Sequence, residues 1–167
     1  IPLNTKIMFN DETEVENRFP SLNGFDGTSN EKKSYLLVSR HTSEEGIVEL
    51  IDLKDFNILH TWNPDIDEFN NMLVREYEWQ NLSRDSNNKR ARLIHPELTD
   101  DGGLLYTAGT LQKIDGCSNL IYQISYDRFH HSIETDTEGN IWVPSSMYPN
   151  SLAPKVTQNR NSASQDF

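Results

Sequence analysis

The stretch HHSIETDTEGNIWV, residues 130–143, constrains the fold more than any other part of the chain. Two histidines open it, a polar run from Asp136 to Asn140 follows, and Ile141-Trp142-Val143 closes it with residues that favour β-strands. Gly139 lies in the polar run, where a glycine accepts the positive φ that a tight turn requires. The stretch therefore predicts a β-hairpin whose incoming strand begins at the histidines.

A similar stretch, HPELTDDGGLLYTAG at residues 95–109, occurs earlier in the chain. Sliding it forward by about 36 residues pairs His95 with His131 and Tyr106 with Trp142, which indicates an internal repeat. A period of roughly 35–45 residues with several short strands per unit is typical of one blade of a β-propeller. Because strand starts in that architecture face a shared axial funnel, we expect both histidines to face one cavity.

The composition excludes several classes of function. The 167 residues include 26 acidic and 15 basic side chains, with a formal net charge of −11, so a nucleic-acid backbone would be repelled. No apolar run approaches the ~18 residues that a membrane helix needs. The one cysteine, Cys117, excludes an intrachain disulfide, and no His/Cys cluster for zinc lies beside it. The start Ile1-Pro2-Leu3, followed at once by polar residues, is what we expect of a mature or trimmed N-terminus.

Strand and turn signals predict successive blades along the chain. Three runs, SYLLVSRH, IVELIDL and FNILHTW, predict a meander of short strands that forms a first blade over residues 34–63. The second blade covers residues 91–126, with strands expected near 93–98, 104–108, 111–114 and 120–124. A third blade begins within residues 127–150.

The remaining segments carry weaker patterns. Residues 64–90 predict an insertion that is partly helical, with Asp65 or Asp67 as its N-cap. Residues 1–33 predict an irregular arm with one strand near Lys6–Phe9, and residues 151–167 predict an irregular tail.

These patterns predict an all-β chain with about two and a half propeller blades of four-stranded antiparallel sheet. A propeller closes only with about four to eight blades, and an incomplete one leaves sheet edges exposed to aggregation. We therefore expect the chain to be part of a larger propeller, whose other blades lie in a longer polypeptide or in companion chains.

Two motifs resemble a known family. The run GIVELIDLKDFNILHTW, residues 46–62, and the HHSIETDTEGNIWV stretch are similar to segments of the arylsulfotransferase family, the kind independent of phosphoadenosine phosphosulfate. The resemblance covers roughly residues 34–148. It implies a six-bladed propeller, periplasmic or secreted, that moves sulfate from an aryl sulfate ester to a phenol through a transiently sulfated histidine, without a cofactor. Ser132 follows the histidine pair, where the family more often has an acidic residue.

Sulfuryl transfer leaves negative charge on the nonbridging and leaving oxygens, so a site needs cationic donors and a nucleophile that can be covalently loaded. Histidine can fill either role because its ordinary pKa lies near neutrality. His131 and His95, at equivalent blade positions, are the first candidates. Strand alternation places His130 on the opposite side from His131, and the repeat register favours His131 for the funnel.

The supporting candidates are a cation and two aromatic residues. Arg128 is the nearest cationic side chain, and Tyr106 or Tyr126 is expected to pack an aromatic acceptor. The basic run Lys89-Arg90-Arg92 is too short to argue for an anion site. Structural roles are also expected. The aspartates Asp100, Asp101 and Asp136 fix turns. The aromatics Trp62, Tyr106 and Trp142 pack between blades.

Two other functions remain open. The first is a metal-assisted propeller lyase or hydrolase, similar to virginiamycin lyase, which would use axial histidines and need a divalent ion. The second is a noncatalytic propeller that serves as a binding platform. In either case the candidate histidines can also be structural groups that bond a neighbouring backbone carbonyl.

Overall fold

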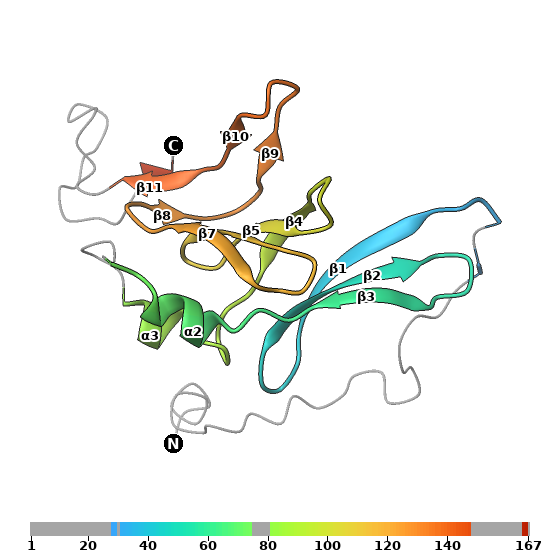
Figure 1. Ribbon diagram of the computed structural model, residues 1–167, viewed down its shortest axis with the longest axis horizontal. Helices are drawn as coiled ribbons and strands as arrows, with labels where there is room; N and C mark the ends of the chain where they lie inside the picture. Colours follow the sequence, from blue (N-terminus) through green and yellow to red (C-terminus); the bar gives the residue numbers. More distant parts are fainter. Residues whose placement is uncertain (1–27, 30, 75–80, 148–164, 167) are drawn as a thin grey trace, which may run out of the picture.

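The computed structural model describes residues 28–29, 31–74, 81–147 and 165–166. This part of the chain consists of antiparallel strands and two short helices, which confirms the predicted all-β class (Figure 1). No propeller is identified and no sheet is closed among these residues. The strand predicted near Lys6–Phe9 lies outside the described residues.

The first sheet is formed by β1 (Tyr35–His41), β2 (Gly46–Asp52) and β3 (Ile58–Trp62), in that order. These are the three strands that the sequence predicts for residues 34–63. Gly46 is required at the start of β2 because a Cβ there would lie 2.7 Å from the carbonyl oxygen of Ala91. The backbone of the first sheet therefore packs directly against the backbone of the segment before the second sheet, with no room for a side chain between them.

The insertion is partly helical, as predicted. Helix α2 (Ile66–Asn71) begins after Asp65, whose Oδ1 accepts a hydrogen bond from the Glu68 backbone N–H at 3.0 Å, so Asp65 is the N-cap. Helix α3 (Leu82–Asp85) follows after residues 75–80, which lie outside the described part.

The second sheet contains the four strands predicted for this segment. In spatial order these are β4 (Ile94–Leu98), β5 (Leu104–Thr107), β6 (Leu111–Ile114) and β7 (Leu120–Ile124). Successive residues of a strand point to opposite faces, and every residue of β5 is buried. Strand β5 is therefore covered on both of its faces.

The third unit is a long hairpin that is interrupted in the middle. Its incoming strand is divided into β8 (Arg128–Phe129) and β9 (Glu134–Thr135), and its outgoing strand into β10 (Ile141–Trp142) and β11 (Ser145–Met147). β9 pairs with β10, and β8 pairs with β11. The other edge of β11 pairs with β12 (Gln165–Asp166), so the predicted irregular tail contains a strand pairing.

Two apolar clusters hold these layers together. One joins the first and second sheets and includes Val48, Trp62, Leu104 and Tyr106. The other contains Leu105, Leu111, Phe129 and Ile133 and joins the second sheet to the hairpin. The second sheet is therefore the middle layer, as Figure 1 shows for β4, β5 and β7.

Polar contacts tie the end of β3 to the loops of the second sheet. The His60 Nε2 atom lies 2.7 Å from the Gly116 carbonyl oxygen, and the Trp62 indole N–H donates to the Gly102 carbonyl at 3.2 Å. The Asn63 backbone N–H donates to the Ser118 hydroxyl at 2.8 Å. These bonds orient the first sheet against the second.

The hairpin turn is fixed by Asp136, in agreement with the role expected from the sequence. Asp136 Oδ1 accepts the backbone N–H groups of Glu138 and Asn140 at 2.9 and 2.8 Å, and its Oδ2 accepts the Trp142 indole N–H at 3.0 Å. Gly139 has a φ of 83°, as the turn requires. Asp115 organises the β6–β7 loop with the same Asp-to-Asn spacing, because its Oδ1 accepts N–H groups two and four residues later.

Candidate functional site

The histidines His95 and His131 share an unusual backbone conformation. Their φ angles are 45° and 64°, in the left-handed region that L-residues avoid at a cost of about 1–2 kcal/mol. His95 lies at a bulge where the pairing of β4 with β5 shifts between Ile94 and Glu97, next to Pro96, which has no N–H for a strand ladder. Both histidine side chains are exposed. The two residues therefore mark an equivalent bend in two successive hairpins.

The strand pairing in the two hairpins is shifted by one residue from the sequence alignment that pairs His95 with His131. Leu104 pairs with Leu98 at the end of the first hairpin, and Ile141 pairs with Thr135 at the end of the second. Leu104, rather than Leu105, thus occupies the position of Ile141. The bends that contain the histidines absorb this difference.

His130 has a different environment from His131. Both ring nitrogens of His130 are shielded from solvent, and its backbone N–H donates to the Pro144 carbonyl at 3.1 Å. The two imidazole rings meet edge to face, with centroids 4.5 Å apart and planes at 84°. The sequence register favours His131 for a shared cavity, whereas the structure places His130 in the wall of a cavity and His131 on the surface.

That cavity, which we call the arginine pocket, has a volume of about 240 Å³. It lies between the end of α3, the segment that enters β4, the β5–β6 turn and the start of β8. The apolar and small lining residues are Ala91, Ile94, Ala108, Gly109 and Phe129. The charged and polar lining residues are Asp85, Ser86, Arg90, Arg92, Arg128 and His130.

The arginines of this pocket differ in how they are paired. Arg90 Nη1 donates to the Arg84 backbone carbonyl at 3.0 Å. Arg92 and Arg128 form no ion pair and donate no side-chain hydrogen bond to any described residue. By contrast, Arg40 and Arg84, the other arginines in the described ranges, are paired with carboxylates. The pocket therefore holds cationic groups that no carboxylate in the described ranges neutralises by contact.

Asp85 is the acidic residue of the pocket wall. Its carboxylate accepts two hydrogen bonds from Arg84, both at 2.7 Å. This bonding lowers the pKa of Asp85, and the charges of Arg90 and Arg128 add to the effect. Asp85 is thus already engaged by Arg84 and lies within electrostatic range of Arg90 and Arg128.

Ser86 anchors the pocket wall to the second sheet. Its buried hydroxyl donates to the Ala108 carbonyl, at the β5–β6 turn. Gly109 in that turn has a φ of 83°, so its backbone adopts a conformation that favours glycine. The turn and the end of α3 are therefore held together as one side of the pocket.

A second, smaller cavity adjoins the same arginine. It has a volume of about 100 Å³ and is lined by Ser39, Arg40, His41 and Arg92. Arg92 lines both cavities. The end of β1 and the segment before β4 thus contribute to one basic region.

Neither predicted tyrosine lines the arginine pocket. Tyr106 is 0% exposed, within the core between the first two sheets, and its hydroxyl has no hydrogen-bond partner among the described residues. Burial raises the pKa of Tyr106 far above its ordinary value. Its surroundings fit the packing role that the sequence also suggested.

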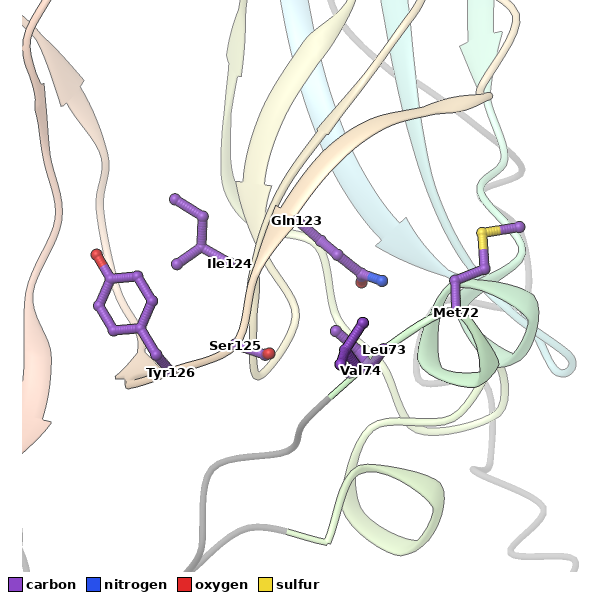
Figure 2. Close-up of a pocket in the computed structure, with 7 residues that line it drawn as sticks. All are labelled: Met72, Leu73, Val74, Gln123, Ile124, Ser125 and Tyr126. Atoms are coloured by element: carbon purple, nitrogen blue, oxygen red, sulfur yellow. The ribbon is translucent and has the colours of Figure 1, made fainter.

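Tyr126 is exposed at the rim of a more apolar pocket of about 330 Å³, formed by the end of β7 and the residues at and after the end of α2 (Figure 2). Figure 2 shows Ile124 and Gln123 projecting to opposite sides of the strand, with Met72 on the Gln123 side. The Tyr126 ring contacts Phe129 edge to face at 5.8 Å. Because Phe129 lines the arginine pocket, Tyr126 is separated from that pocket by one aromatic ring.

The sequence contains a signal for Arg92 besides the short basic run. The offset that pairs His95 with His131 also pairs Arg92 with Arg128. The length of the run Lys89-Arg90-Arg92 does not reveal this site, because Arg128 is distant in sequence and lies in the same pocket wall.

Within the described ranges, no group of three or more His, Cys, Asp or Glu side chains is arranged to hold a metal ion. No helix in the same ranges is both long enough and apolar enough to cross a membrane. Comparisons with protein-family models, with curated proteins and with solved structures found no match to this chain.

Proposed function

We propose that the arginine pocket binds the sulfate group of an aryl sulfate ester, and that the chain is part of a β-propeller sulfotransferase. The observation that carries this proposal is that Arg92 and Arg128 line one cavity without a carboxylate partner among the described residues. The chain has a formal net charge of −11, so carboxylates to pair with arginines are abundant. Two arginines left without one favour an external anion.

The chemistry of the side chains fits an oxyanion. A guanidinium presents a planar set of N–H donors that can bind two oxygens of a sulfate, phosphate or carboxylate at once. Arg92 and Arg128 lie beside the shielded imidazole of His130 in the same pocket. Arg92 and Arg128 are themselves exposed, so an anion can reach them from solvent.

The size of the cavity favours a small charged group over a whole ligand. Its volume of about 240 Å³ is below the roughly 300–1,000 Å³ of pockets that enclose a drug-sized molecule. The sulfate group would occupy the cavity, and the aryl ring would lie toward the rim. Phe129, a buried lining residue with Tyr126 packed on its edge, would supply the aromatic contact.

His130 is the residue we assign to the chemical step. Both of its ring nitrogens are shielded in this structure, so the imidazole must turn toward the cavity before it reacts. An imidazole nitrogen of His130 attacks the sulfur atom, the bond from sulfur to the aryl oxygen breaks, and the phenolate leaves. A phenol acceptor, deprotonated by the departing phenolate, then attacks the sulfur and releases His130. Arg92 and Arg128 would offset the negative charge on the sulfate oxygens throughout. The net change moves one sulfate group and one proton between two phenols.

The layered sheets support the propeller part of the proposal. The second sheet is a four-stranded antiparallel meander that is covered on both faces by neighbouring sheets (Figure 1). Blades of a propeller stack in this way around a central axis. Further blades would be needed for closure, in a longer polypeptide or in companion chains.

Transfer of sulfate from 4-nitrophenyl sulfate to a phenol, by the particle as isolated, tests the proposal. We expect His130→Ala and Arg128→Ala to reduce turnover by about 10²-fold or more, since each removes a group that contacts the reacting sulfate. Lys89→Ala is the matched control, because it removes an exposed positive charge from the same basic run without changing the pocket lining. Turnover that is unchanged in Arg128→Ala would contradict the proposed site, and sulfate binding without turnover would favour a binding platform.

A further inference from the structure

Arg92 lines two cavities. The arginine pocket is on one side, and the smaller cavity of about 100 Å³ at the end of β1 is on the other. A molecule whose sulfate group binds Arg92 and Arg128 therefore has a second polar cavity within reach of the same guanidinium. The second cavity is lined by Ser39, Arg40, His41 and Arg92.

The charge of the combined site exceeds what one sulfate ester supplies. Arg40 is neutralised by Glu49, and Arg84 by Asp85. Arg90, Arg92 and Arg128 form no ion pair with a carboxylate among the described residues, although Asp85 lies within electrostatic range of Arg90 and Arg128. A sulfate monoester carries one negative charge, so it leaves positive charge at the site uncompensated. A ligand with a second anionic group would compensate more of it.

Arg40 provides N–H donors in the second cavity, and an ion pair with Glu49 fixes the position of its guanidinium. Its Nε and Nη2 atoms donate to the two carboxylate oxygens of Glu49, both at 2.7 Å. The Glu49 side chain is 7% exposed, whereas the Arg40 side chain is 47% exposed, so the buried partner anchors the exposed one. The Nη1 group of Arg40 takes no part in this pairing and keeps its N–H donors for another acceptor.

The other two residues complete the cavity wall. The Ser39 hydroxyl donates to the Leu93 carbonyl at 2.6 Å, which fixes the end of β1 to the segment that carries Arg92. His41 Nδ1 contacts the Thr42 carbonyl, which orients the exposed imidazole ring. The donors available to a ligand are therefore those of Arg92 and Arg40 Nη1, with His41 at the rim.

We propose that the cavity of Ser39, Arg40, His41 and Arg92 is a second anion subsite, which accepts a carboxylate, sulfate or sulfonate substituent of the ligand held in the arginine pocket. This inference rests on the proposed function, because the first anionic group must occupy the arginine pocket. It makes the preferred ligand an aromatic compound with two anionic groups. Arg92 then contacts both groups, and Arg40 contacts only the second.

Binding of unreactive aromatic sulfonates to the full chain, measured by isothermal titration calorimetry, tests the inference. The probes are benzenesulfonate, with one anionic group, and a series with two groups at increasing separation: benzene-1,3-disulfonate, naphthalene-1,5-disulfonate and naphthalene-2,6-disulfonate. We expect at least one disulfonate to bind about tenfold or more tightly than the monosulfonate, because the second group gains charged hydrogen bonds.

Two variants locate the second group. The double substitution Arg40→Met with Glu49→Met replaces the ion pair with apolar side chains of similar length and leaves no unpaired buried carboxylate. It should remove most of the disulfonate advantage and leave monosulfonate affinity unchanged. His41→Ala changes an exposed side chain and should reduce that advantage by about threefold or more. If the double variant does not fold, as judged by circular dichroism, His41→Ala decides the question.

The outcomes separate this inference from the proposed function. Equal affinity for all sulfonates, or an advantage that survives the folded Arg40/Glu49 variant and His41→Ala, would overturn the second subsite. Monosulfonate binding that Arg128→Ala weakens would still support the arginine pocket in that case. Absence of monosulfonate binding, or binding insensitive to Arg128→Ala, would overturn both.

Discussion

Arg92 and Arg128 line the same cavity, and neither forms an ion pair with a described residue. They are related by the same sequence offset as His95 and His131. Each arginine lies near the start of the first strand of its hairpin, so the repeat delivers one guanidinium from each of two adjacent sheets to a single pocket. An internal repeat of this kind can build a site because equivalent positions of stacked sheets are neighbours in space.

Sulfate should stabilise the folded protein by binding to Arg92 and Arg128. A ligand that binds only the folded state at ten times its dissociation constant adds about 1.4 kcal/mol to the free energy of unfolding. For a chain of this size the melting temperature should then rise by roughly 3–6 °C. Differential scanning fluorimetry against sodium sulfate would measure the shift.

Sulfate also stabilises many proteins without binding, because it is excluded from protein surfaces. The double variant Arg92→Ala with Arg128→Ala, compared with Lys89→Ala, separates the two effects. The shift should fall in the double variant and persist in Lys89→Ala. An equal shift in all three proteins would indicate exclusion alone.

Gly103→Ala should destabilise the second sheet. An ideal Cβ at Gly103 would lie 2.1 Å from the Ile114 carbonyl oxygen, which is a backbone atom and cannot move aside alone. A clash of this kind costs about 1–3 kcal/mol or more. Chemical denaturation would measure the change in the free energy of unfolding.

Gly116→Ala is the matched control for that clash. The nearest atom to its added Cβ, the Gly102 carbonyl oxygen, is at 3.3 Å, so the neighbour needs to shift by only a few tenths of an ångström. We expect a smaller loss than for Gly103→Ala. Equal losses at both positions would show that closeness to Ile114 does not determine the cost.

Asp136 should make stability depend on pH in the acid range. The hydrogen bond from Trp142 and those from Asn140 and Glu138 lower the pKa of Asp136 from 3.8 to about 2. A lowered pKa in the folded state means that the contribution is fully present above the unfolded pKa, near 3.8, and is lost as the pH falls through about 2.

Urea denaturation at a series of pH values, for the native chain and for Asp136→Asn, tests this dependence. The native chain should be the more stable above the unfolded pKa, and the difference should shrink as the pH falls toward the folded value. The Trp142 indole, 64% exposed, reports the same event through its fluorescence. A difference in stability that stays constant across this range would rule out the titration of Asp136 as its cause.

Tyr106→Phe should leave anion binding unchanged and should not destabilise the protein. The hydroxyl of Tyr106 is buried and has no hydrogen-bond partner among the described residues, so it carries a desolvation cost with no compensating bond. Removing it should raise the free energy of unfolding by about 0–2 kcal/mol. A marked loss of stability in chemical denaturation would reveal a hydroxyl contact, and a loss of sulfonate affinity would restore the substrate-binding role that the sequence suggested.

The strands of the second sheet could be predicted because their signals are local. The apolar residues of β5, β6 and β7 and the turn residues between them are contiguous in the chain, and four predicted strands match four observed ones. Asp136 is a similar case, because an Asp side chain bonds the backbone within its own turn. Such features need only a few neighbouring residues.

The choice between His130 and His131 could not be made locally. Alternation along a strand says that the two side chains diverge, but not which one faces the cavity. The hairpin is interrupted between β8 and β9, and His131 adopts a left-handed backbone there. That bend lies between the pairing of β8 with β11 and the pairing of β9 with β10, and His130 lines the arginine pocket beside it.

The amino-acid sequence by itself thus determined the antiparallel strands, the repeat and the turns. The reason is that the alternation of apolar and polar residues, the placement of glycine and the hydrogen bonds of Asp side chains each involve only a few neighbouring residues. Tertiary packing decided which side chains meet. Arg92 and Arg128 share a pocket only because adjacent sheets stack through Leu105 and Phe129, and Tyr106 is withdrawn from any ligand because the first sheet covers it. Contacts between sheets depend on how whole faces pack, and no short segment of sequence contains that information.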